Sequence, residues 1–136
     1  LPEAERDSRS AARLQPSDAD VRNNLGRALA LQGRPGEAMA EYEAAARLAP
    51  EHPLVQVNIG RLLLAQGRTE EARQRFEEAL RRRPRDVEAQ LEMGHALASL
   101  GRSAEACAAW AQALRLDPGL DEARGARAAA RCRRED

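Results

Sequence analysis

Apolar side chains recur at helical spacing in three successive stretches of the chain. An apolar residue is followed three and four positions later by two more, as in Leu25 with Ala28-Leu29, Ile59 with Leu62-Leu63 and Met93 with Ala96-Leu97. This i, i+3, i+4 stripe is typical of an amphipathic helix that buries one face. A second apolar and Ala-rich stretch follows each of them, so the pattern predicts pairs of helices.

The stretches belong to an internal repeat of 34 residues, whose positions we number as places 1 to 34. Seven places hold the same residue type in all three units. They are Gly26, Gly60 and Gly94 at place 8; Gly33, Gly67 and Gly101 at place 15; Glu37-Ala38, Glu71-Ala72 and Glu105-Ala106 at places 19 and 20; Tyr42, Phe76 and Trp110 at place 24; Ala45, Ala79 and Ala113 at place 27; and Pro50, Pro84 and Pro118 at place 32.

Each shared place has a physical reason. The glycine at place 15 suits a left-handed residue that ends the first helix. Pro35, Thr69 and Ser103 follow two residues later, where proline and hydroxyl side chains suit the start of a second helix. A glycine inside a helix costs about 1 kcal/mol relative to alanine. We therefore expect the place-8 glycine to allow close approach of the second helix, with the place-24 aromatic filling the adjoining space.

This frame divides the chain into one domain of about eight helices. Residues 19–52, 53–86 and 87–120 form three complete repeats, residues 1–18 read as the second helix of a partial repeat, and residues 121–136 read as a polar capping helix. The start at Leu1, without Met and inside a repeat, suggests a fragment of a longer protein.

These residues resemble the tetratricopeptide repeat (TPR), a 34-residue helix pair with a Leu-Gly…Tyr…Ala…Phe…Ala…Pro signature. The chain departs from it at place 4, with Arg22, Gln56 and Gln90, and at Arg82, where the other units have Leu. The resemblance implies an all-α fold, a right-handed solenoid of antiparallel helix pairs with the first helices lining a concave groove. Partners in this family lie in that groove as extended peptides or helices.

Composition narrows the classes of partner. Lys+Arg and Asp+Glu both number 22, so the balanced charge gives no general attraction to nucleic acid or to an anionic membrane. Every fixed cation is arginine, which together with abundant alanine suggests a bacterial source. The sequence contains no run of 18 apolar residues that could span a membrane and no signal peptide. The compartment stays unassigned. Cys107 and Cys132 lack a redox or zinc spacing and are expected to be incidental small residues.

The resemblance places the second, fifth, sixth and ninth residues of each first helix in the groove. These are Asp20, Asn23, Asn24 and Arg27; Leu54, Val57, Asn58 and Arg61; and Glu88, Leu91, Glu92 and His95. Asn24 and Asn58 resemble two rungs of the asparagine ladder of O-linked N-acetylglucosamine transferases, and Arg27 and Arg61 suit carboxylates. We predict an extended acidic and apolar peptide; the alternative is that Asn and Arg are solvated surface. The Lys-Asn-Arg clamp of chaperone-binding relatives is not reproduced, so an EEVD-type terminus is not expected.

No catalytic motif, cofactor loop or metal-ligand spacing stands out, and His95 reads as a groove or surface residue because His52 is the only other histidine. The leading hypothesis is a non-catalytic protein–protein interaction scaffold within a larger bacterial assembly protein, with no cofactor, nucleic acid or membrane insertion. Two alternatives stay open: the substrate-selecting region of an enzyme such as a glycosyltransferase, and a scaffold that self-associates through the N-terminal half-repeat.

Overall fold

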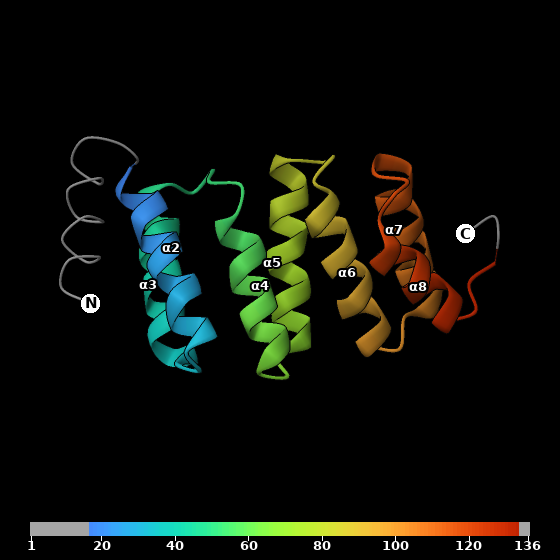
Figure 1. The fold of residues 1–136 in the computed structure, drawn as a ribbon, viewed down its shortest axis with the longest axis horizontal. Coiled ribbons are helices and arrows are strands. Elements are labelled where there is room, and N and C mark those ends of the chain that lie inside the picture. Colours follow the sequence, from blue (N-terminus) through green and yellow to red (C-terminus); the bar gives the residue numbers. More distant parts are fainter. Residues whose placement is uncertain (1–16, 134–136) are drawn as a thin grey trace.

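The computed structural model describes residues 17–133, and these form an all-α solenoid in which successive helix pairs follow one another along the long axis (Figure 1). Seven helices lie within this part of the chain. They are α2 (Asp18–Leu31), α3 (Pro35–Leu48), α4 (Val55–Ala65), α5 (Thr69–Arg82), α6 (Val87–Ser99), α7 (Ser103–Leu116) and α8 (Asp121–Ala129). Of the partial repeat predicted for residues 1–18, residues 1–16 lie outside the described residues, and Asp18 already begins α2.

The turns inside the helix pairs confirm the role predicted for the place-15 glycines. Gly33, Gly67 and Gly101 have φ values of 76°, 77° and 78°, the left-handed region that side chains disfavour. At the first turn, the Arg34 amide donates to the Leu29 carbonyl and the Gly33 amide donates to the Ala30 carbonyl. The same two bonds recur at the other turns, so each first helix ends in a Schellman motif.

An arginine–glutamate pair closes each of these turns from the outside. The guanidinium of Arg34 binds the carboxylate of Glu37, and Arg68 with Glu71 and Arg102 with Glu105 repeat the arrangement. The hydrogen bond from Arg68 is the main cause of a lowered pKa of Glu71. Arg34, Arg68 and Arg102 are the N-cap residues of the second helices, and their side chains make no capping hydrogen bond to the backbone. Each instead forms an ion pair with the glutamate in the first turn of its helix.

The core confirms that the place-8 glycines allow two helices to approach closely. A methyl group at Gly60 would lie 2.4 Å from Phe76 Cε1, and one at Gly94 would lie 2.2 Å from Trp110 Nε1. Gly26 and Tyr42 repeat this contact at 2.6 Å. The three aromatic side chains are buried, so each ring occupies the space that a β-carbon on the facing helix would need.

Neighbouring pairs stack through alanine-rich faces. Each second helix contacts the next first helix, and the first helices α2, α4 and α6 also contact one another in sequence. The alanines at places 20 and 27 of the second helices are all buried; they are Ala38, Ala45, Ala72, Ala79, Ala106 and Ala113. No helix among residues 17–133 has the length and apolarity that crossing a membrane requires.

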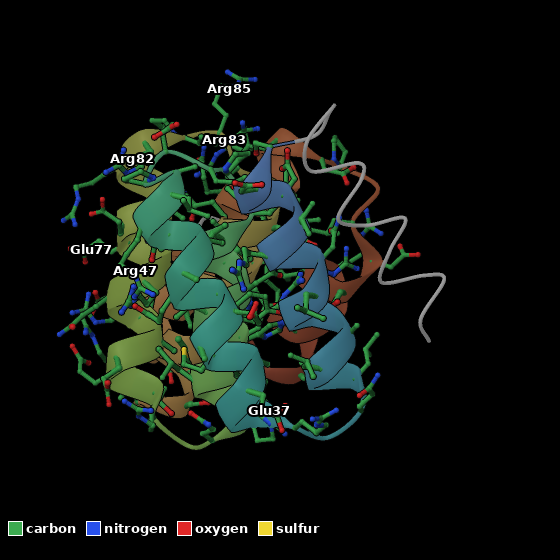
Figure 2. All side chains as sticks on the ribbon, turned by 90° about the vertical axis from the view of Figure 1, so that its left-hand side faces the viewer. Glu37, Arg47, Glu77, Arg82, Arg83 and Arg85 are labelled. Carbon is green, nitrogen blue, oxygen red and sulfur yellow. A yellow bond between two sulfur atoms is a disulfide. The ribbon has the colours of Figure 1, made fainter. Side chains whose placement is uncertain are left out.

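The arginine-rich segment near the end of α5 is largely neutralised by neighbouring acids. Arg81 and Arg82 both bind Glu78, and Arg73 bridges Glu70 and Glu77. Arg82, Arg83 and Arg85 lie near one end of the helices, and Glu37 lies near the other end (Figure 2). This segment therefore resembles the solvated, paired helix face expected of charged residues spaced three and four apart.

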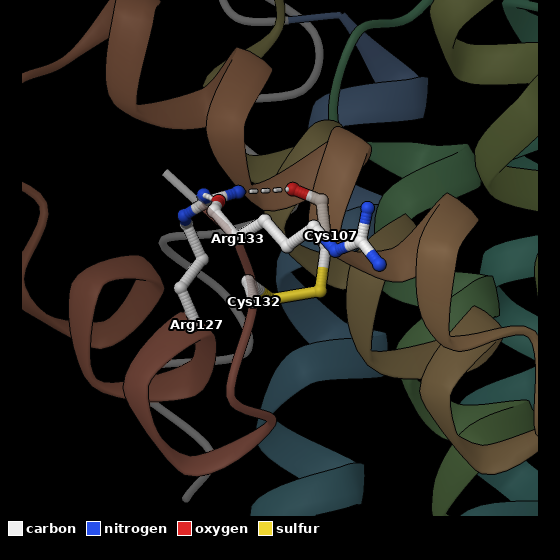
Figure 3. Close-up of a disulfide and its surroundings, with 4 residues drawn as sticks. All are labelled: Cys107, Arg127, Cys132 and Arg133. Atoms are coloured by element: carbon white, nitrogen blue, oxygen red, sulfur yellow. Dashed lines mark hydrogen bonds between the residues drawn. A yellow bond between two sulfur atoms is a disulfide. The ribbon is translucent and has the colours of Figure 1, made fainter. Parts of the chain in front are cut away.

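The C-terminus differs from the sequence prediction in two respects. Cys107 of α7 and Cys132 form a disulfide, with their Cα atoms 5.6 Å apart, so the prediction that they are incidental was wrong (Figure 3). The capping helix α8 ends at Ala129 because Arg131 turns into the left-handed region with φ 56°. That turn carries Cys132 back toward α7, where Arg127 Nη1 also donates to the Cys107 carbonyl at 2.7 Å.

Candidate functional site

The candidate site is the surface formed by side chains of α2, α4 and α6, which we call the first-helix surface. Asn24, Arg27 and Leu54 are exposed on it, and Arg61, Glu92 and His95 are partly exposed. Asn23, Val57 and Leu91, which occupy place 5 in the three repeats, are buried between helices. The structure thus places five of the ten predicted residues where a partner can reach them directly, because the Glu92 side chain is only 13% exposed and Asn58 is buried.

Asn23 and Asn58 form a buried polar contact between the first two repeats. Asn58 Nδ2 donates to Asn23 Oδ1 at 2.8 Å. Both side chains are shielded from water, so each amide satisfies part of the other's hydrogen-bonding capacity. Asn58 occupies the same place in its repeat as Asn24. Its hydrogen bond to Asn23, however, gives Asn58 a role in stacking the repeats.

We expect Asn23→Ala to lower the free energy of unfolding by about 1 to 2 kcal/mol, because it leaves the Asn58 amide buried without this acceptor. Urea denaturation of both single variants and of the Asn23→Ala/Asn58→Ala double variant measures the coupling. The double variant should cost less than the sum of the singles. Additive costs would show that the hydrogen bond contributes nothing beyond the two separate side chains.

A second set of contacts joins place 9 of one repeat to place 2 of the next. Arg61 Nη2 donates to Glu88 Oε1 at 2.6 Å, and His95 Nε2 lies 2.9 Å from Glu122 Oε2. Arg61 Nε also lies 3.8 Å from Glu92 Oε1. The place-9 side chains of the second and third repeats are therefore already engaged by acids of the same chain.

Arg27 occupies place 9 of the first repeat and differs from Arg61. The residues equivalent to Glu88 and Glu92 are here Leu54 and Asn58, neither of which is acidic. Arg27 is exposed and makes no hydrogen bond or ion pair within residues 17–133. Leu54 is 43% exposed, which is high for a leucine. At the first junction between repeats, Arg27 therefore has no acidic partner among the described residues, and the apolar Leu54 occupies the place that Glu88 holds at the next junction.

The part of the first-helix surface around Arg61 and Glu92 differs electrostatically from the part around Arg27. Burial raises the pKa of the Glu92 carboxyl, while the charges of Arg61 and His95 oppose the rise. Burial lowers the pKa of Arg61, but the hydrogen bond and charge of Glu88, with Glu92 and Glu122, raise it overall. This end therefore concentrates acidic groups around one guanidinium.

The structure adds partners that sequence reasoning missed. Asp20 pairs with His52 at 2.6 Å, and the hydrogen bond from His52 is the main reason that the pKa of Asp20 is lowered. The sequence predicts only a capping helix around Glu122, yet the Glu122 side chain contacts His95. The repeat numbering could have indicated this contact, because Glu122 occupies place 2 of the unit that follows the third repeat, as Glu88 does in the third repeat.

Comparisons with known proteins agree on the family. Two family models described as "Tetratricopeptide repeat" match residues 17–85 and 57–121. No curated protein matches the chain.

Solved structures of similar fold include the first TPR of Spaghetti (RPAP3) bound to the HSP90 peptide SRMEEVD, at TM-score 0.82 and 20% identity, covering 86% of this chain and 93% of that one. The Arabidopsis OM64 TPR domain has TM-score 0.80 and 26% identity, covering 83% and 93%. YrrB, titled a TPR protein with an unusual peptide-binding site, has TM-score 0.77 and 21% identity, covering 93% and 66%. The chain belongs to the tetratricopeptide repeat family.

Proposed function

We propose that this chain binds an extended peptide segment containing acidic and apolar residues, and that Arg27 is the main anchor for an acidic side chain. The observation that carries the proposal is the contrast between Arg27 and Arg61. Arg61 is held by Glu88 and Glu92, whereas Arg27 has no acidic partner within the described part of the chain. A carboxylate of the partner would take the place that Glu88 fills one repeat later.

The neighbouring side chains suit the rest of such a segment. Asn24 is exposed and offers both a donor and an acceptor, which match the two hydrogen-bonding groups of an extended peptide backbone. Leu54 offers an apolar contact for a side chain on the same segment. A guanidinium binds a carboxylate through two parallel hydrogen bonds, so Arg27 would also fix the orientation of the peptide.

The relatives of similar fold support a peptide as the class of partner. One of them is solved with an HSP90 peptide, and another is titled for its peptide-binding site. This chain contains no lysine, so we expect it to favour an internal acidic residue over the terminal carboxylate that a Lys-Asn-Arg clamp binds.

Arg27→Met is expected to weaken binding of an acidic peptide about tenfold, since a hydrogen bond to a charged group contributes about 1.5 to 3 kcal/mol. The experiment measures fluorescence anisotropy with a set of labelled extended peptides that carry Glu and Leu. The same peptides with Gln for Glu should bind wild type and variant equally. The melting temperature should stay unchanged, because Arg27 makes no internal ion pair among the described residues.

Arg47→Met is the matched control. Arg47 is also exposed and makes no ion pair within residues 17–133, but it lies on α3, away from the first-helix surface. It should leave peptide affinity unchanged. Equal losses in the two variants would indicate a nonspecific charge effect, and an unchanged affinity in Arg27→Met would refute the assignment of Arg27.

We further propose that residues 1–136 act as one non-catalytic scaffold domain of a larger bacterial assembly protein. Exclusive use of arginine as the fixed cation, with abundant alanine, supports a bacterial source, and the repeat family supports an interaction role. An affinity pull-down with the full-length protein, followed by mass spectrometry, identifies the partners. A catalytic domain in the full-length sequence would favour the substrate-selecting alternative.

A further inference from the structure

Three potential metal ligands converge where α6 meets the capping helix α8. Glu92 and His95 lie three residues apart on α6, and Glu122 lies in the first turn of α8. One ligand atom from each of the three side chains lies within 4.8 Å of the others. Glu-x-x-His is a spacing that places a carboxylate and an imidazole on the same face of a helix, as in helix-bundle metal sites.

The distances are close to those that a bound ion requires. Zinc takes nitrogen and oxygen ligands at about 2.0 to 2.2 Å, so two ligands on a tetrahedral ion lie about 3.4 Å apart. His95 Nε2 and Glu122 Oε2 are already 2.9 Å apart. Small changes in the Glu122 side chain, which is largely exposed, would accommodate an ion between them.

The surroundings of Glu92 also favour a cation at this position. Its side chain is only 13% exposed, yet it accepts no hydrogen bond from the described residues. Arg61 Nε lies 3.8 Å from Glu92 Oε1, and Arg61 directs its own hydrogen bond to Glu88. A largely buried carboxylate without a close donor is costly, and coordination of a metal ion is one way in which proteins satisfy such a group.

We propose that Glu92, His95 and Glu122 form a binding site for one divalent transition-metal ion such as Zn²⁺. An imidazole with two carboxylates suits zinc and its neighbours in the first transition row, whereas Ca²⁺ and Mg²⁺ prefer oxygen ligands alone. Three protein ligands leave a fourth position for water. The ion would tie the capping helix α8 to α6 and replace the direct contact between His95 and Glu122.

A tryptophan beside His95 allows metal binding to be followed by fluorescence. Trp110 is the only tryptophan in the chain, and its ring centroid lies 5.6 Å from that of His95. Binding of Cu²⁺, which is paramagnetic, at His95 should therefore quench the tryptophan fluorescence. The diamagnetic Zn²⁺ should compete for the site and restore the emission.

The test uses the full chain with its disulfide oxidised, so that the cysteine thiols do not bind the metal. Calorimetric titration with Zn²⁺ should show one ion per chain, and saturating Zn²⁺ should raise the melting temperature because it binds only the folded state. His95→Gln and Glu122→Gln should each weaken Zn²⁺ binding by about tenfold or more, at least the loss seen when a group that merely supports a ligand is removed. Glu122 lies on the exposed side of α8, so its substitution tests the site without disturbing the core.

Two further variants sharpen the result. His52→Gln removes the other histidine, which pairs with Asp20, and should leave Zn²⁺ affinity and Cu²⁺ quenching unchanged. Arg61→Met removes the competing cation beside Glu92 and should tighten Zn²⁺ binding. The proposal is overturned if the wild-type chain binds no Zn²⁺ at millimolar concentration, or if His95→Gln and Glu122→Gln bind it as tightly as wild type.

Discussion

Gly60→Ala is expected to lower the free energy of unfolding by about 2 to 3 kcal/mol, in the upper part of the range for overpacking a core. Helix propensity alone predicts the opposite, a gain of about 1 kcal/mol for replacing glycine by alanine inside a helix. The new methyl group would lie 2.4 Å from Phe76 Cε1 and 2.7 Å from its Cζ. Phe76 is fully buried, so its ring cannot move aside into solvent.

Gly125→Ala is the matched control. Gly125 also lies inside a helix, α8, but a β-carbon there meets nothing within 4 Å. It should gain about 0.5 to 1 kcal/mol in stability. Urea denaturation of both variants gives the comparison, and a stabilising Gly60→Ala would contradict the packing explanation.

A second substitution tests whether the ring itself causes the loss. Phe76→Leu makes room beside residue 60, so the cost of Gly60→Ala should be smaller in that background. If the cost is the same with leucine as with phenylalanine, the strain arises elsewhere in the contact between α4 and α5. The same experiment applies to Gly94 with Trp110, where the approach is closer.

Reduction of the Cys107–Cys132 disulfide is expected to lower the stability of the C-terminal region by about 3 kcal/mol, from the chain-entropy cost of closing a loop of this size. The two cysteines are 25 residues apart, and the loop between them contains all of α8. Hydrogen exchange of the oxidised and reduced chains measures the effect residue by residue. Exchange should accelerate in α8 and in the adjoining part of α7.

The distant repeat provides the internal control for this prediction. In a repeat array each unit contacts mainly its neighbours, so amides of α2 and α3 should exchange at nearly the same rates in both redox states. Equal protection of α8 in the two states would show that Arg127 and the apolar contact of Ala123 hold the capping helix without the disulfide. A global loss of protection would contradict the local effect predicted here.

The sequence was sufficient for the features that depend on local chemistry. A glycine at place 15 needs only its own φ angle to end a helix, and Gly33, Gly67 and Gly101 do so. The place-8 glycines and place-24 aromatics were predicted to meet because each lies in a helix pair joined by a short turn. The 34-residue period therefore determined the helices, their turns and the contact inside each pair.

The exposed residues of the first-helix surface were harder to predict from the sequence. Place 5 was assigned to the groove, yet Asn23, Val57 and Leu91 are buried. Arg27 and Arg61 looked equivalent, and only the stacking of repeats shows that Arg61 is occupied by acids of the next unit. The difference depends on neighbours that a single repeat does not contain.

What the sequence by itself determined is the repeating helix pair, because each of its signals acts over a few residues or across one tight turn. Only the tertiary structure decided the disulfide, the Asn23–Asn58 bond and the convergence of His95 with Glu122. These contacts join residues 25, 35 and 27 positions apart. Their formation depends on how one pair packs on the next, a geometry set by side-chain shape at the junctions and not by the period of the repeat.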